Sequence, residues 1–126
     1  MDLIIIKRDG SQTTSMPQQQ AESYLLKSDL VPKNLESNLK QVLNDVYSGK
    51  GKASSSYVYN GHPVLHASSG NSQKSVTAFF YKGTDANYLI ALGEHSGEIK
   101  GNTSYRITIY GQTAGDFKEN GRVTLS

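Results

Sequence analysis

The sequence predicts an α+β fold, in which an N-terminal strand and two helices pack on one face of a mostly antiparallel sheet of about four to five strands. Apolar residues recur at helical spacing in the first half, and from Tyr57 onward at every second residue. The length of 126 residues suits one domain. We therefore expect a single domain, with strand and helices in 1–49, a basic Gly/Ser loop in 50–56 and the antiparallel sheet in 57–126.

The first half of the chain predicts three elements. Residues 3–8 are a β-branched apolar run that ends at a turn, so they predict a strand. Residues 18–27 are good helix formers that follow a proline, which favours a first helix. The second helix, over 35–47, is the clearest, because its apolar residues form one stripe at spacings of three and four: Leu35, Leu39, Val42, Leu43, Val46 and Tyr47.

The second half predicts a meander of strands. Residues 50–56 are rich in Gly, Ser and Lys and predict a flexible basic loop, while Asn60 and Gly61 predict a tight turn. Pro63 indicates an edge strand or a bulge. Strands are predicted at 57–59, 64–67, 76–82, 88–92, 105–110 and 122–126, with polar loops at 68–74, 83–87, 96–103 and 111–121.

Alternation within the strands predicts which side chains face the helices. The helix-facing set is Tyr88, Ile90, Leu92, Tyr105, Ile107 and Ile109. The other face is expected to be open and polar and to hold the functional residues, with Leu89, Ala91, Gly93, His95, Arg106, Thr108 and Tyr110.

Composition narrows the function classes. The chain has no cysteine, which excludes disulfides, thiolate catalysis and cysteine zinc sites. A net charge of +2 is only mildly basic. We expect no signal peptide and no membrane association, because no apolar run is long enough. These features fit a cytoplasmic protein, and equally a secreted effector that acts in the cytoplasm of a target cell.

Histidines are the strongest candidates for chemistry. His95 lies with Glu94 between Gly93 and Gly97, where it serves either as a general acid or base or as part of a surface turn. His62 and His66 are four residues apart, which on a strand separates them by about 13 Å. We therefore expect no metal site and no cofactor, and of this pair His66 is the better catalytic candidate.

Cationic and aromatic residues supply candidate phosphate contacts. Arg106 and Lys82 are either phosphate clamps or ordinary surface charge. Lys50 and Lys52, in the Gly/Ser loop, either contact phosphate or belong to a solvated connection. The eight tyrosines serve sheet packing or base stacking.

Two helices followed by an antiparallel sheet, with His, Arg, Lys and Tyr on its open face, resemble the small ribonuclease toxins, which include RelE-like toxins, colicin-type nuclease domains and barnase. The resemblance is one of element order over most of the chain. It implies RNA cleavage without a metal, the RNA being tRNA, mRNA or ribosome-associated RNA, and a cognate immunity or antitoxin protein as partner. It implies acid–base roles for His95 or His66, phosphate contacts for Arg106 and Lys82, and substrate contacts for Tyr110, Tyr81, His62, Thr108 and Lys52.

The alternative is a protein-binding module without catalysis, such as an immunity protein, an antitoxin or a secretion-system adaptor. The same layered fold and exposed tyrosines serve such a role. The two classes differ in whether His95, His66 and Arg106 converge in one pocket.

Overall fold

The computed structural model describes residues 2–7, 9–27, 31–59, 61–71, 74–99, 102–107 and 123–125, and their side chains except those of 54–57 and of residues from 95 onward. The elements in chain order are β1 (Asp2–Ile5), α1 (Gln18–Lys27), a 3-10 turn (Lys33–Leu35), α2 (Glu36–Tyr47), β2 (Lys52–Tyr59), β3 (His62–Gly70), β4 (Ser75–Lys82), β5 (Ala86–Ile99), β6 (Asn102–Ile107) and β7 (Val123–Leu125).

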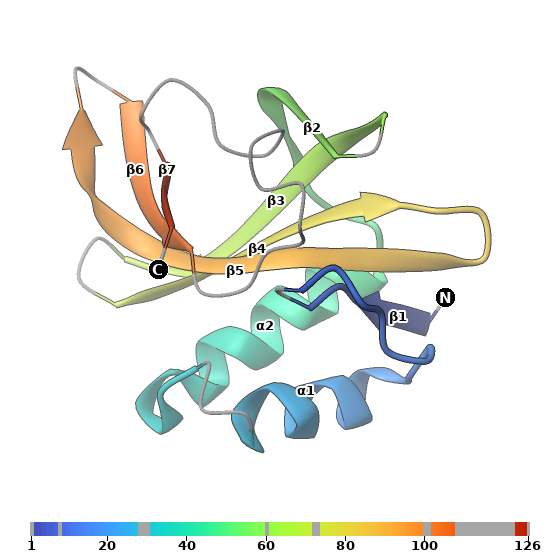
Figure 1. Cartoon of the computed structure of the whole chain (residues 1–126). Coiled ribbons are helices and arrows are strands. Elements are labelled where there is room, and N and C mark those ends of the chain that lie inside the picture. The colour runs from blue at the N-terminus through green and yellow to red at the C-terminus, as the bar shows by residue number, and fades with distance from the viewer. Residues whose placement is uncertain are drawn as a thin grey trace.

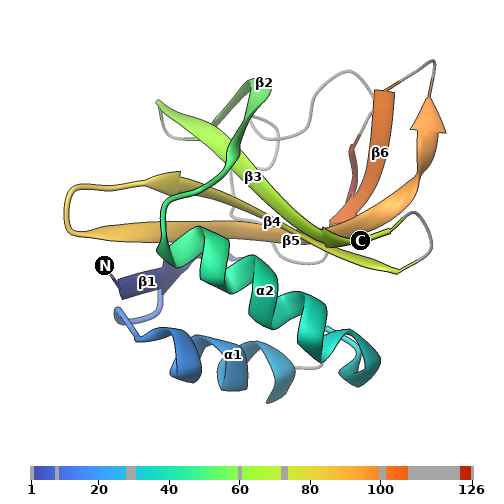
Figure 2. The same cartoon turned by 180° about the vertical axis from the view of Figure 1, so that it is seen from behind.

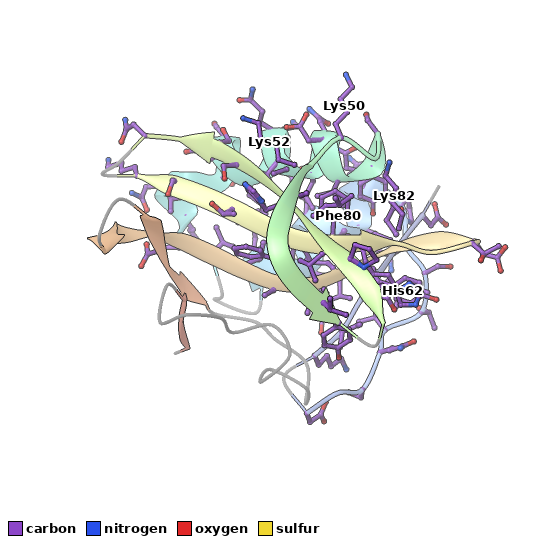
Figure 3. The ribbon with its side chains drawn as sticks, turned by 90° about the horizontal axis from the view of Figure 1, so that it is seen from above. Lys50, Lys52, His62, Phe80 and Lys82 are labelled. Atoms are coloured by element: carbon purple, nitrogen blue, oxygen red, sulfur yellow. The ribbon has the colours of Figure 1, made fainter. Side chains whose placement is uncertain are left out.

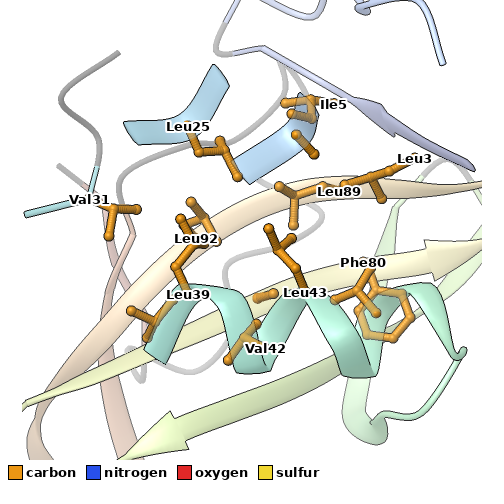
Figure 4. Close-up of a cluster of buried hydrophobic side chains, with 14 of the residues drawn as sticks. Leu3, Ile5, Leu25, Val31, Leu39, Val42, Leu43, Phe80, Leu89 and Leu92 are labelled. Carbon is orange, nitrogen blue, oxygen red and sulfur yellow. The ribbon is translucent and has the colours of Figure 1, made fainter. Parts of the chain in front are cut away.

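Both helices lie on one face of the sheet (Figures 1 and 2). Helix α2 forms where its stripe predicts, and Leu39, Val42, Leu43 and Val46 are completely buried against the sheet. Figure 4 shows the core between the layers, where these side chains meet residues of α1, β1, β4 and β5, among them Leu25, Leu3, Ile5, Phe80, Leu89 and Leu92. Burial of this apolar surface is the main force that holds the layers together.

The strands form one sheet of seven, in the order β2-β3-β4-β5-β6-β7, with β1 also paired to β5. The first half of β5 pairs with β1 in parallel and its second half pairs with β6 antiparallel, both on the edge opposite β4. Strand β7 pairs with β6 in parallel. The predicted α+β class, with a strand and two helices on a mostly antiparallel sheet, is confirmed. Each of the seven described strands overlaps a segment that the sequence predicts as a strand, and all seven belong to one sheet instead of the four to five strands expected in it.

The face of the sheet away from the helices is not open and polar, so this prediction is wrong at its centre. Strands at both ends of the sheet rise away from the helices (Figures 1 and 2) and give this face a trough-like shape. A second buried cluster lies there, made of Ile6, Tyr59, Val64, Phe79, Tyr81, Ile90 and Ala91, with Tyr88 packed against it. Strand β4 is therefore buried on both faces over Ser75–Tyr81.

A bulge in β5 explains why the predicted alternation fails there. Phe79 is opposite Ala91 and Phe80 is opposite Leu89, so Ile90 is an extra residue in the ladder. Ile90 and Ala91 consequently both belong to the second cluster, whereas Leu89 and Leu92 face the helices. Tyr88, Ile90 and Leu92 are the β5 residues predicted to face the helices, and only Leu92 faces them. The corresponding predictions for β6 concern side chains outside the described residues.

Several predicted loops are strands. The basic Gly/Ser loop of 50–56 is wrong from Lys52 onward, because β2 begins there. Strand β3 continues to Gly70 and β5 to Ile99, over residues predicted as polar loops. Tyr59 pairs with His62 and Gly61 has a φ of 81°, as the predicted tight turn requires, while Asn60 lies outside the described residues. No helix in the described parts of the chain is long and apolar enough to cross a membrane.

Candidate functional site

A pocket of about 430 Å³ lies between the C-terminal end of α2 and the first residues of β2. Its walls include Asp45 from α2, Lys50 and Gly51 from the connection, Lys52 from β2, and His66 and Ser68 from β3. Figure 3 shows Lys50 and Lys52 at the margin of the molecule near this end of the helix.

The local sequence explains how the chain enters this pocket. Gly49 adopts a left-handed φ of 69°, which ends α2, and the Lys50 amide donates a hydrogen bond of 2.8 Å to the carbonyl of Asp45. The chain then passes tightly over Phe80, because a Cβ on Gly51 would stand 2.8 Å from Phe80 Cζ. Lys52 follows directly and opens β2.

His66 is the imidazole among the residues that line the pocket. It is half-buried and directly opposite Lys52 in the β2–β3 ladder, and its ring centroid lies 6.2 Å from that of Phe79. Burial lowers the pKa of His66 below 6.5, and the positive charge of Lys52 lowers this pKa further, while a hydrogen bond with the Lys52 backbone opposes both. Near neutral pH the imidazole is therefore predominantly neutral and able to accept a proton.

The charges around His66 favour an anion. Two lysines and one aspartate line the pocket, which gives a formal charge of +1 from the ammonium groups of Lys50 and Lys52 and the carboxylate of Asp45. Ser68 adds a hydroxyl, which lies 2.8 Å from the hydroxyl of the buried Thr77. Such an arrangement can bind a phosphate group and remove a proton from a hydroxyl beside it. The positive charges of these lysines also interact favourably with the negative, C-terminal end of the α2 helix dipole.

Aromatic rings form a ladder on the same face of the sheet, further along β3. His62 stacks on Tyr81 with a centroid distance of 4.3 Å and an interplanar angle of 12°. Tyr81 stacks in turn on Tyr88 at 4.7 Å and 5°, and Tyr59 lies 6.2 Å from Tyr81. Burial, together with the neighbouring Tyr88 and Tyr59, raises the pKa of Tyr81, so its hydroxyl stays protonated and its ring serves packing or stacking.

The structure brings together only some of the predicted site residues. Lys52 and His66 share the pocket, and His62 and Tyr81 share the ladder. Lys82 follows Phe80 on the helix-facing side, and its Cε would lie 3.1 Å from a Cβ at Gly49, the residue before Lys50 of the pocket. Its phosphate contact stays a prediction.

His95 and Arg106 lie in the β5–β6 pair, where Arg106 is opposite Glu94 and His95 is opposite Tyr105. Their side chains, and all of Thr108 and Tyr110, fall outside the described residues. His66 is level with Ala91 across β4, and His95 is four residues further along β5. The ladder therefore separates the two histidines by roughly 16 Å of backbone, which does not favour a shared pocket.

Sequence reasoning missed Asp45, Gly51 and Ser68 as parts of the site. The only signal was the cluster of lysines after α2, which the sequence placed in a loop of unknown position. Among the described residues, no three His, Asp or Glu side chains gather closely enough to hold a metal ion.

Comparison with known proteins gives no further guide to this site. The chain matches no protein-family model, no curated protein and no solved structure. The case for a function therefore depends on the pocket and the ladder themselves.

Proposed function

We propose that the protein is a ribonuclease that works without a metal and cleaves RNA at the His66 pocket. One observation carries this proposal: a half-buried imidazole with a lowered pKa lies opposite Lys52 in a pocket that also holds Lys50. Phosphodiester transesterification needs a base that accepts the hydroxyl proton and cations that stabilise the charge on the phosphate, and a neutral imidazole beside two ammonium groups supplies both. The resemblance in element order to small ribonuclease toxins points the same way.

In the proposed reaction, His66 accepts the proton of a ribose 2′-hydroxyl, and that oxygen bonds to the adjacent phosphorus. Lys50 and Lys52 stabilise the extra negative charge that develops on the phosphate oxygens. The bond from phosphorus to the 5′-oxygen breaks, and this oxygen takes up a proton from a lysine ammonium or from water. The products are a 2′,3′-cyclic phosphate and a 5′-hydroxyl, and His66 then releases its proton to solvent.

The remaining predicted residues take different places in this proposal. The phosphate contact of Lys82 stays a prediction, and its side chain lies against Gly49, next to Lys50 of the pocket. His95 and Arg106 stay predictions, and any role for them belongs to a second region of a bound RNA. The partners proposed are RNA and a cognate immunity or antitoxin protein, and the setting is a cytoplasm, either its own or that of a target cell.

The test is the integrity of RNA after addition of purified protein in the presence of EDTA, with total RNA, tRNA and a translation extract as substrates. We expect the parent to produce 2′,3′-cyclic phosphate ends and His66→Ala to cleave about a hundredfold more slowly or worse. Lys40→Ala, at an exposed position of α2, is the control for a substitution outside the pocket and should cleave like the parent. Intact RNA with all three substrates would overturn the proposal.

Lys52→Ala adds a readout that loss of structure would not imitate. Removing the charge opposite His66 should raise the pKa of its imidazole, because the Lys52 ammonium lowers it. The acid limb of the rate–pH profile should therefore move to higher pH in Lys52→Ala and stay in place in Lys40→Ala. An unmoved limb would mean that His66 is not the base.

A non-catalytic protein-binding module is the second candidate. The observation that favours it is the separation of His66 from His95 and Arg106 in the sheet, which leaves the pocket with one imidazole. The mild net charge of +2 agrees with it. This candidate predicts intact RNA in every arm of the experiment above.

A further inference from the structure

The aromatic ladder ends in an exposed ring, and this ring lies on the same strand as the proposed cleavage pocket. We propose that the imidazole of His62, backed by Tyr81, is a stacking platform for one unpaired nucleobase, so that the substrate is single-stranded RNA lying along β3. This inference rests on the proposed function and adds to it the substrate class and a base-binding residue.

The ladder is prepared to accept one more ring. Its planes are nearly parallel, at 12° between His62 and Tyr81 and 5° between Tyr81 and Tyr88, with centroids 4.3 and 4.7 Å apart. Tyr81 is only 7% exposed and so is fixed by its surroundings, whereas His62 is exposed. A planar ligand ring that stacks on His62 continues the series without a rearrangement of the protein.

The backbone around His62 is also held. Gly61, with its φ of 81°, completes the tight turn before His62, and His62 pairs with Tyr59 across the hairpin. Pro63 follows, and a residue that precedes proline is restricted to extended conformations. Little conformational freedom is therefore lost when a ligand orders this position.

The position of the ladder relative to the pocket identifies the ligand. His62 and His66 are four residues apart on β3 and lie on the same face, since His62 stacks on Tyr81 and His66 contacts Phe79. The spacing along the strand is about 13 Å. Figure 3 likewise shows His62 apart from Lys50 and Lys52. A ligand that offers a flat ring at one point and a phosphate about 13 Å further on is a polynucleotide.

Stacking on His62 selects a single strand. Bases within a duplex are already stacked on their neighbours, so only an unpaired base can leave the strand and lie on a protein ring. Several nucleotides of single strand span the distance from the platform to the pocket. The pocket would then hold the scissile phosphate while the platform holds a base on one side of it.

The experiment measures binding of a 2′-O-methyl RNA hexamer, which lacks the nucleophilic hydroxyl and cannot be cleaved by this route. The hexamer carries 2-aminopurine, whose fluorescence is quenched when it stacks. We expect quenching and binding with the parent, about tenfold weaker binding with His62→Ala, and near-parental binding with His62→Phe. Val58→Ala removes the exposed apolar side chain opposite Pro63 and is the matched control on the same hairpin, with unchanged binding.

Failure of this inference is distinct from failure of the proposed function. RNA cleavage that His62→Ala leaves unchanged in KM and kcat would overturn the platform and keep the ribonuclease. Hexamer binding that depends on His62, without cleavage of any natural RNA, would overturn the ribonuclease and keep the platform. Equal binding of the hexamer and of its duplex, or equal loss in His62→Phe and His62→Ala, would also overturn the platform.

Discussion

Replacing Gly51 with alanine should destabilise the protein through a clash with Phe80. The added Cβ would stand 2.8 Å from Phe80 Cζ and 2.9 Å from Cε1, and ordinary contacts begin at 3.4 Å, so 3.4 − 2.8 = 0.6 Å must be recovered by movement. Phe80 is completely buried in the helix-facing core and has little room to yield. Overpacking of this kind costs about 1–3 kcal/mol of the free energy of unfolding.

Urea unfolding followed by far-UV circular dichroism and tyrosine fluorescence measures this cost, since the chain has eight tyrosines and no tryptophan. Phe80→Leu removes the two ring atoms that the new Cβ would meet, at a cost of about 1–2 kcal/mol by itself. In the Phe80→Leu background, Gly51→Ala should therefore cost less than half of what it costs in the parent.

Gly61→Ala is the control for this cycle. No atom lies within 4 Å of a Cβ built there, so its cost, about 1 kcal/mol, comes from the positive φ alone. That cost should be the same with Phe80 or with Phe80→Leu. The steric argument is wrong if Gly51→Ala is neutral, or if its cost does not depend on Phe80.

Three further predictions concern individual side chains. Asn87→Ala should lower the free energy of unfolding by about 1–2 kcal/mol, because the buried Nδ2 donates a 2.8 Å hydrogen bond to the carbonyl of Val46, and Asn87→Asp should lower it more because it buries a carboxylate. Tyr47→Phe should lower the free energy of unfolding by about 0.5–1.5 kcal/mol, because it removes the 2.8 Å hydrogen bond that the Tyr47 hydroxyl donates to the carbonyl of Met16. The parent should lose stability as pH falls through 6.5, because burial lowers the pKa of His66 and the unfolded chain therefore protonates His66 at higher pH than the folded chain does. His66→Gln should lose that part of the slope. Urea unfolding measures all three, and equal pH slopes in the parent and His66→Gln would contradict the last.

The helices could be predicted because their signals are local. Helix α1 spans Gln18–Lys27, which is the predicted range, and α2 follows from an apolar stripe that needs no knowledge of the rest of the chain. Residues 52–56 carry no apolar alternation, and they form a strand only because β3 offers a partner. Strand formation there depends on tertiary context, which propensity does not contain.

The faces of the strands could be predicted only up to the first bulge. In β5 the extra residue Ile90 reverses the alternation, so the sequence pattern assigned Tyr88 to the wrong face. The polar-face prediction failed for a related reason. The sheet curls, and its outer strands contribute Tyr59 and Val64 to a second buried cluster on the face away from α1 and α2.

The candidate pocket depends on a register shift in the β2–β3 ladder that the sequence pattern does not predict. The tight turn pairs Tyr59 with His62 and Val58 with Pro63, so the two numbers sum to 121, and a regular hairpin would pair Lys52 with residue 121 − 52 = 69. Ser69 faces the helices, where it hydrogen-bonds with Asn38 and Gln41 of α2.

The observed partner of Lys52 is His66, with a sum of 118, because the ladder shifts by 121 − 118 = 3 residues between Ala53 and Val58. This shift turns Lys52 away from the helix layer and places its charge beside the imidazole whose pKa it lowers. A regular strand β2 of the same length would leave His66 without that neighbour. Shortening β2 by the three extra residues should make the hairpin regular and keep Lys52 opposite His66, because three steps from Val58 then match the three steps from Pro63 to His66. The lysine contribution to the pKa of His66 and the proposed cleavage should therefore both survive the deletion. Loss of cleavage in a folded deletion variant would show that the Lys52–His66 pairing is not the origin of the activity.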